Sequence, residues 1–212
     1  YFCGLLKKRM PVILHIETST SVCSVALSKD NRCLKQKTSF EGPSHNVLLS
    51  VFIQEMLDYA REAQLPIDAV AISAGPGSYT GLRIGTATAK GLCFGFDIPL
   101  IALNTLKIMA KEVGEVQNIE KNTLLCPMID ARRMEVYSAV FNSHLEEIRE
   151  TKAEIMDENS FSDLLDTHKI LFFGNGAEKC KSLFTQTNAI FADNIHPLAN
   201  NMISLAEEKF EQ

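Results

Sequence analysis

The sequence lacks the features that mark several classes of protein. It contains no tryptophan, its six cysteines form no C-x-x-C pair, and no histidine stands at zinc-finger spacing from them. This pattern excludes a zinc finger and favours unpaired thiols in a reducing cytosol, so we expect a cytoplasmic protein. No apolar run approaches the roughly 20 residues of a transmembrane helix, so we expect no membrane contact.

A strong excess of charge is also missing. The net charge is −5 over 212 residues. Such a chain has no surplus of cations to neutralise phosphates, so we do not expect it to bind nucleic acid on its own. The hydrophobic share of 46% is that of a globular protein with a sizeable core.

The first half of the chain is predicted to be a strand meander followed by strands that alternate with helices. Residues 29–31 predict a hairpin turn, and Ser44 is the expected N-cap of the first helix. The spacing of apolar residues predicts strands at 12–17, 24–28, 32–40, 69–73 and 98–103, and helices at 47–62 and 82–96.

The second half repeats this theme. Strands are predicted at 124–129, 135–141, 145–155 and 170–173, with a short helix at 160–165 capped by Ser160 or Ser162 and a closing helix at 199–210. Because the helix-like stretch 107–122 is polar, we place the boundary between two lobes near 104–122. We expect an extension at 1–9, a first lobe at 10–104 and a second at 105–212, with the last helix packing back on the first lobe.

Two lobes that each open on a strand hairpin match an α/β architecture, the duplicated ribonuclease-H-like fold of actin-like proteins. An ordinary doubly wound α/β domain would give a similar pattern.

The stretch AGPGSYTGLRIG at 74–85 is the most distinctive motif. It lacks the Gly-Lys-Ser/Thr ending of a Walker loop, and its third glycine is misplaced for a dinucleotide fingerprint. Gly81 and Gly85 lie four residues apart, as do Gly91 and Gly95, which predicts small helix faces that let another helix approach. We expect that neighbour to be the helix at 47–62, from this chain, a partner chain or both. A phosphate loop is the alternative.

The helix at 47–62 is apolar on more than one side, which predicts burial on more than one side. We therefore predict that the two helices form a docking surface for a partner. Its predicted residues are Leu48, Val51, Phe52, Glu55, Met56, Tyr79, Leu82, Arg83, Gly85, Thr86 and Ala89.

Three further segments could hold a nucleotide. A strand that ends in Glu17 and is followed by the hydroxyls of Thr18 and Thr20 is typical of a phosphate hairpin, although a polar turn explains it equally. Asp130 could belong to a second phosphate loop, but Ala131-Arg132-Arg133 follow it in place of glycines. Gly174 and Gly176 follow the strand predicted at 170–173 and are explained by a turn that ends it. We expect at most weak binding of ATP or ADP.

Four segments, in order, carry a resemblance to a known family: LHIETSTSVCSVAL, AGPGSYTGLRIG, PMIDARRMEVYSAVF and FFGNGAEK. From about Met10 to near the C-terminus the chain resembles the TsaB (YeaZ) family. The resemblance implies a two-lobed actin-like fold and a non-catalytic scaffold that activates TsaD, together with the ATPase TsaE, in forming N6-threonylcarbamoyladenosine beside the tRNA anticodon. It also implies a homodimer in isolation, contact with tRNA only within the complex, no required cofactor, and at most ATP or ADP at the partner interface. Gly174 and Gly176 would lie where relatives hold adenosine.

The sequence departs from TsaD where that enzyme has Asn-His-x-x-x-His on a helix. Here Asn104 is followed by Thr105 and, four residues later, by Met109. Two histidines four residues apart on a helix can both reach one metal ion, whereas a hydroxyl and a thioether are poor ligands for a hard or borderline cation. We therefore expect no metal site, no catalytic residues and no peptidase activity.

Two alternatives stay open. A stand-alone actin-like kinase or carbamoyl transferase would use Glu17, Thr18, Thr20 and Asp130. Direct binding to tRNA would use Arg132, Arg133 and the segment 35–37, on a surface completed by a partner.

Overall fold

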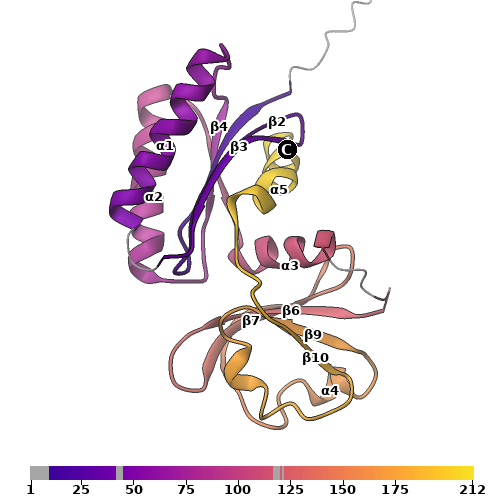
Figure 1. Ribbon diagram of the computed structural model, residues 1–212. Helices are drawn as coiled ribbons and strands as arrows, with labels where there is room; N and C mark the ends of the chain where they lie inside the picture. The colour runs from indigo at the N-terminus through magenta and orange to yellow at the C-terminus, as the bar shows by residue number, and fades with distance from the viewer. Residues whose placement is uncertain (1–9, 42–44, 117–119, 121) are drawn as a thin grey trace, which may run out of the picture.

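The protein consists of two five-stranded sheets, one above the other, linked by two crossings of the chain (Figure 1). The computed structural model describes residues 10–41, 45–116, 120 and 122–212. Over these residues, no helix is both long and apolar enough to span a bilayer.

The first sheet has the strand order β3-β2-β1-β4-β5. Its first three strands are antiparallel, and β4 and β5 run parallel to β1. Asp30 and Asn31 both have left-handed backbone angles, as a two-residue hairpin turn requires, so the predicted turn is confirmed. The strands are β1 (Val12–Glu17), β2 (Cys23–Lys29), β3 (Arg32–Ser39), β4 (Ala69–Ser73) and β5 (Leu100–Leu103).

The second sheet repeats this topology. Read from its β8 edge, the order β8-β7-β6-β9-β10 corresponds to β3-β2-β1-β4-β5, again with three antiparallel strands followed by two parallel ones. The predicted duplication of an α/β unit is therefore confirmed. The strands are β6 (Leu124–Asp130), β7 (Glu135–Phe141), β8 (Glu147–Ile155), β9 (Ile170–Phe173) and β10 (Ala189–Ala192).

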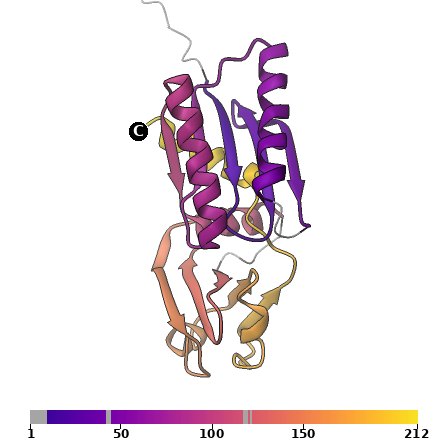
Figure 2. The ribbon, with the colours of Figure 1, turned by 90° about the vertical axis from the view of Figure 1, so that its left-hand side faces the viewer.

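Helices cover the first sheet on both faces. Helices α1 (His45–Glu62) and α2 (Tyr79–Phe96) lie on one face, and α5 (Ile203–Phe210), preceded by the 3₁₀ helix η2 (Ala199–Met202), lies on the other (Figures 1 and 2). The buried side chains Leu49, Ile53 and Met56 anchor α1 on the strands. The outward sides of α1 and α2 remain open to solvent.

The second sheet has only short helices in the equivalent places, α4 (Ser162–Leu165) and the 3₁₀ helix η1 (Glu178–Cys180). Helix α3 (Thr105–Val116) crosses from the first sheet and packs on β6 and β7. Although the sequence in this region is polar, α3 buries Leu106, Met109 and Val113. It belongs to the core of the second sheet.

The starts of α2 and α4 differ from the predictions. Helix α2 begins at Tyr79, three residues before the predicted Leu82, because Ser78 caps it by accepting a hydrogen bond from the Gly81 N–H. Neither Ser160 nor Ser162 caps α4. Phe161 is its N-cap residue, without a side-chain hydrogen bond, and the Ser160 hydroxyl instead donates to Asp157. The predicted cap Ser44 lies outside the described residues.

Candidate functional site

The hairpin predicted to hold phosphate is closed by the chain itself. The Thr18 hydroxyl donates to the carbonyl of Gly81 at 2.8 Å, and the Ser78 N–H donates to the carbonyl of Ser19 at 2.6 Å. Both contacts join the β1–β2 turn to the start of α2. Because the Thr18 hydroxyl and the Ser78 N–H are bonded in this way, neither is available to bind a phosphate group.

The glycines of this region owe their presence to that closure. A Cβ at Gly77 would lie 2.3 Å from the Ser19 carbonyl oxygen, and one at Gly81 would lie 2.0 Å from that of Thr18. At Gly85 it would lie 2.3 Å from the Thr18 hydroxyl oxygen. No side chain fits at such distances.

The prediction that this glycine face receives another helix is therefore wrong. Gly81, Gly85 and Ala89 are buried inside the chain, where Thr18 fills the space beside the two glycines. By contrast, Cβ atoms at Gly91 and Gly95 would meet nothing within 4 Å.

Glu17 is fully buried at the end of β1. Its carboxylate accepts the Ser19 N–H at 2.6 Å. Burial raises the pKa of this carboxyl group, and the Ser19 and Ser73 groups beside it oppose the rise only in part. Thr20, also buried, accepts the Val22 N–H within the same turn. An acid enclosed in this way cannot face a nucleotide-bound metal in the structure as it stands.

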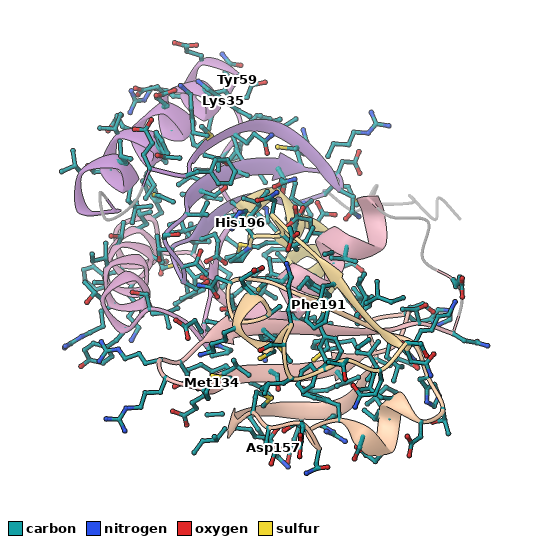
Figure 3. The ribbon with its side chains drawn as sticks, turned by 60° about the horizontal axis from the view of Figure 1, so that its bottom comes forward. Lys35, Tyr59, Met134, Asp157, Phe191 and His196 are labelled. Carbon is teal, nitrogen blue, oxygen red and sulfur yellow. The ribbon has the colours of Figure 1, made fainter. Side chains whose placement is uncertain are left out.

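Asp130 lies in a second closed turn, between β6 and β7. The Lys179 ammonium binds the Asp130 carboxylate and also donates to the carbonyls of Arg133, at 2.8 Å, and Glu135, at 2.7 Å. Burial acts to raise the pKa of Asp130, but hydrogen bonds from Lys179 and from the Arg132 N–H bring it below its usual value. Figure 3 labels Met134 at the outer end of this hairpin.

Arg132 and Arg133 lie in the same turn. Both arginines are exposed, and neither reaches an acid within ion-pair distance in the part of the chain that the structure describes. Lys179 instead forms the ion pair with Asp130. Its partner lies 49 residues away, so no local pattern could have identified it.

Gly174 and Gly176 also sit where side chains cannot fit. A Cβ at Gly174 would lie 2.4 Å from both the Met109 Cε and the Met128 carbonyl oxygen, and one at Gly176 would lie 2.9 Å from the Ile129 backbone. Gly174 borders a cavity of about 420 Å³ that also contacts Glu178, Asp193, Asn194 and His196. His196, labelled in Figure 3, lies on the second crossing between the sheets. This cavity is the open space next to the predicted adenosine position.

The positions that carry histidines in TsaD do not fit a metal here. Thr105 and Met109 are buried, and the Met109 thioether packs on Gly174. Among residues 10–41, 45–116, 120 and 122–212, no three His, Cys, Asp or Glu side chains gather as a metal site requires. The donor set is wrong and the space is filled.

The predicted docking residues divide by exposure. Met56, Gly85 and Ala89 face the interior, which contradicts a direct role for them on the surface. Tyr79 is 73% exposed, Val51 is 49% exposed, and Arg83 is exposed and donates to the Tyr79 hydroxyl at 2.9 Å. The other predicted residues are half-buried beside them: Leu48, Phe52, Glu55, Leu82 and Thr86.

Sequence analysis missed three exposed apolar residues on the same two helices. Val47 is 61% exposed and Phe94 is 93% exposed, and Phe96 ends α2. We define the outer helix face as the exposed side chains of Val47, Val51, Tyr79, Arg83 and Phe94. A shallow groove of about 370 Å³ runs along it between Tyr79 and Lys90. The helical spacing predicts which residues of α2 share a face, but exposure is set by which face the sheet covers.

The chain is similar in sequence to proteins of one family. The family model for TsaD, tRNA N6-adenosine threonylcarbamoyltransferase, matches residues 39–205. The tRNA threonylcarbamoyladenosine biosynthesis protein TsaB of Escherichia coli strain K12 is 29% identical over 208 residues, covering 94% of this chain and 87% of that protein. TsaB of Buchnera aphidicola subsp. Baizongia pistaciae is 31% identical over 175 residues, covering 80% and 77%.

Solved structures agree. YeaZ from Pseudomonas aeruginosa superposes with a TM-score of 0.76 at 26% identity, covering 95% of this chain and 93% of that one. An inorganic polyphosphate/ATP-glucomannokinase from an Arthrobacter strain superposes with a TM-score of 0.51 at 8% identity, covering 95% and 100%, which shows a shared fold alone. The chain has the two-lobed actin-like fold and belongs to the TsaB family, whose members are related in sequence to TsaD.

Proposed function

We propose that this chain is a non-catalytic subunit in the formation of N6-threonylcarbamoyladenosine in tRNA, where it binds TsaD and, together with TsaE, activates it. The observation that carries the proposal is the closed phosphate hairpin. The place where an actin-like enzyme would receive phosphate is filled by contacts of Thr18 and Ser19 with α2. The relatives described above are named for the biosynthesis of this nucleoside.

The same closure argues against a stand-alone kinase or transferase. Glu17 and Thr18 are buried and bonded within the chain, and Asp130 is held by Lys179. We therefore expect no ATP turnover by the isolated chain, and at most weak ATP or ADP binding where a partner completes a site. Calorimetry with Mg-ATP tests this, and turnover by the purified chain alone would favour the enzyme.

The outer helix face supports a role in binding a protein. Exposed apolar and aromatic side chains beside an arginine are typical of the centre of protein interfaces. Because β3 and β4 run parallel to β1, α1 and α2 start at the same end of the first sheet. Val47 and Val51 therefore lie at the same end as Tyr79 and Arg83. We propose that TsaD occupies this face in the cytoplasm, that two copies of the chain share it when TsaD is absent, and that tRNA binds only to the complex.

The experiment compares charge insertions at two exposed apolar sites. Val51→Glu and Tyr79→Glu place a carboxylate in the outer helix face, whereas Ile155→Glu does so on the edge strand β8, where Ile155 is 77% exposed. Each variant is assayed for capture of TsaD and for modified adenosine formed with TsaD, TsaE, ATP and tRNA. We expect the α1 and α2 variants to lose about tenfold or more in binding and the β8 variant to match the wild type. Unchanged binding by both α-helix variants would show that the partner docks elsewhere.

A further inference from the structure

We propose that Thr18 is a positioning residue for partner binding. In this inference, which rests on the proposed function, the β1–β2 turn holds the start of α2 so that the side chains of Tyr79 and Arg83 keep one orientation. Thr18 is 1% exposed and cannot touch a partner itself. Any effect of Thr18 on binding must therefore pass through α2.

A continuous chain of contacts leads from the hairpin to the helix. The Glu17 carboxylate accepts the Ser19 N–H, the Ser19 carbonyl accepts the Ser78 N–H, and Ser78 is the N-cap of α2. Beside this chain of bonds, the Thr18 hydroxyl donates to Gly81 in the first turn of the helix. The first turn, the part of a helix that frays most readily, is thus tied to a buried strand end.

The presented residues lie on the opposite side of the same turn. Positions two apart on a helix differ by about 200°, so Tyr79 and Arg83 face outward where Gly81 and Gly85 face Thr18. Tyr79 and Arg83 form a pair at i and i+4. The Arg83 guanidinium lies 5.1 Å from the centre of the Tyr79 ring and donates to its hydroxyl. A tilt of the first turn would move both side chains together.

The first test removes only the hydroxyl of Thr18. Thr18→Val keeps the branched shape that fills the space beside Gly85 but cannot donate to Gly81. We expect it to weaken binding to full-length TsaD about three- to tenfold, the range that corresponds to one hydrogen bond. Thr18→Ser retains the donor, and we expect it to bind as the wild type does.

The second test asks whether the effect passes through Tyr79. In a double-mutant cycle, Thr18→Val should cost little further binding when Tyr79→Ala is already present. Additive losses, or wild-type binding by Thr18→Val, would overturn the positioning role. The docking proposal would still stand if Tyr79→Ala alone weakened binding. Wild-type binding by Tyr79→Ala would overturn both.

A third measurement needs no partner. In the isolated chain, hydrogen exchange of the amides from Tyr79 to Gly85 should speed up in Thr18→Val while the amides of α1 stay unchanged. Thr18→Ser should restore the slow exchange. If exchange rose equally in α1 and α2, Thr18 would be an ordinary core residue and the inference would fail.

Discussion

Lys179 fastens the turn after β6 by binding the Asp130 carboxylate and two backbone carbonyls at once. The turn needs such a tie because Arg132 and Arg133 both adopt left-handed backbone angles, with φ of 75° and 46°. These angles cost energy in residues other than glycine. Lys179, from η1 in the second lobe, thus holds a backbone conformation that glycines would adopt at lower cost in a phosphate loop. Its ammonium group occupies the turn in place of a phosphate.

Replacing Lys179 by methionine should destabilise the protein. The change leaves the two carbonyls and Asp130 without their charged donor in a position that is only 22% exposed. We expect a loss of about 1–3 kcal/mol in the free energy of unfolding, measured by urea denaturation. Lys181→Met is the matched control, since the Lys181 ion pairs lie at the surface and should contribute less than the contacts of Lys179. Equal losses in the two variants would show that the turn does not depend on Lys179.

Glu112 should make stability fall as the pH rises towards neutrality. Burial raises the pKa of its carboxyl group from 4.5 to about 7, although a hydrogen bond from the His196 backbone opposes this. Because the folded pKa is above the unfolded one, the unfolded chain loses its proton first. The contribution of Glu112 is therefore most favourable below about pH 4.5, declines between pH 4.5 and 7, and is constant above that range.

Glu112→Gln stays neutral at every pH and should remove this decline. We expect wild type and variant to be similar at pH 5, and the variant to be more stable by about 1–2 kcal/mol at pH 8, after allowing for the partial exposure of the group. Urea denaturation across this pH range measures the difference. Glu62→Gln, which removes a carboxylate at the exposed end of α1, is the matched control. A constant gap between wild type and Glu112→Gln would mean that Glu112 does not titrate in this range.

Two glycines of α2 should respond in opposite directions to the same substitution. Gly85→Ala puts a methyl group 2.3 Å from the Thr18 hydroxyl oxygen and should destabilise the fold by about 1–3 kcal/mol. Gly91→Ala adds a methyl group where nothing lies within 4 Å, so it should stabilise the helix by up to about 1 kcal/mol. Thermal unfolding of the two variants compares them directly.

The cause can be isolated with a second substitution. In a Thr18→Ala background the clashing hydroxyl is gone, so Gly85→Ala should cost less than it does in the wild type. The same cost in both backgrounds would show that Gly85 is small for a reason other than Thr18.

Much of the fold could be predicted because its signals are local. The apolar runs of β1, β4 and β9 and the two-residue turn at Asp30 and Asn31 each span only a few residues. Strand periodicity and turn chemistry act over such short distances. The order of the strands within each sheet was not predicted, and the strand β10 was missed.

The reason for the glycines could not be predicted in this way. Sequence analysis identified Gly81 and Gly85 as a small face but assigned it to a second helix. The true neighbour, Thr18, lies 63 residues before Gly81 and meets it only after β1 and α2 have packed. Likewise, Met56 was predicted to be a docking residue but is buried. A helix that is apolar on two sides does not reveal which side the sheet covers.

Restoring the two histidines of TsaD should not create a metal site. Thr105 and Met109 are 0% and 1% exposed, and the Met109 thioether fills the space beside Gly174. A histidine at 109 would bury an imidazole among apolar atoms, in the space beside Gly174. We therefore expect Thr105→His/Met109→His to lose about 2–4 kcal/mol of stability and to bind no stoichiometric zinc after dialysis. Met109→Leu conserves volume and should cost less than about 1.5 kcal/mol. Stoichiometric zinc in the double-histidine variant would mean that the two histidines are sufficient to form a metal site here. The filled space between the sheets would then not be what prevents metal binding.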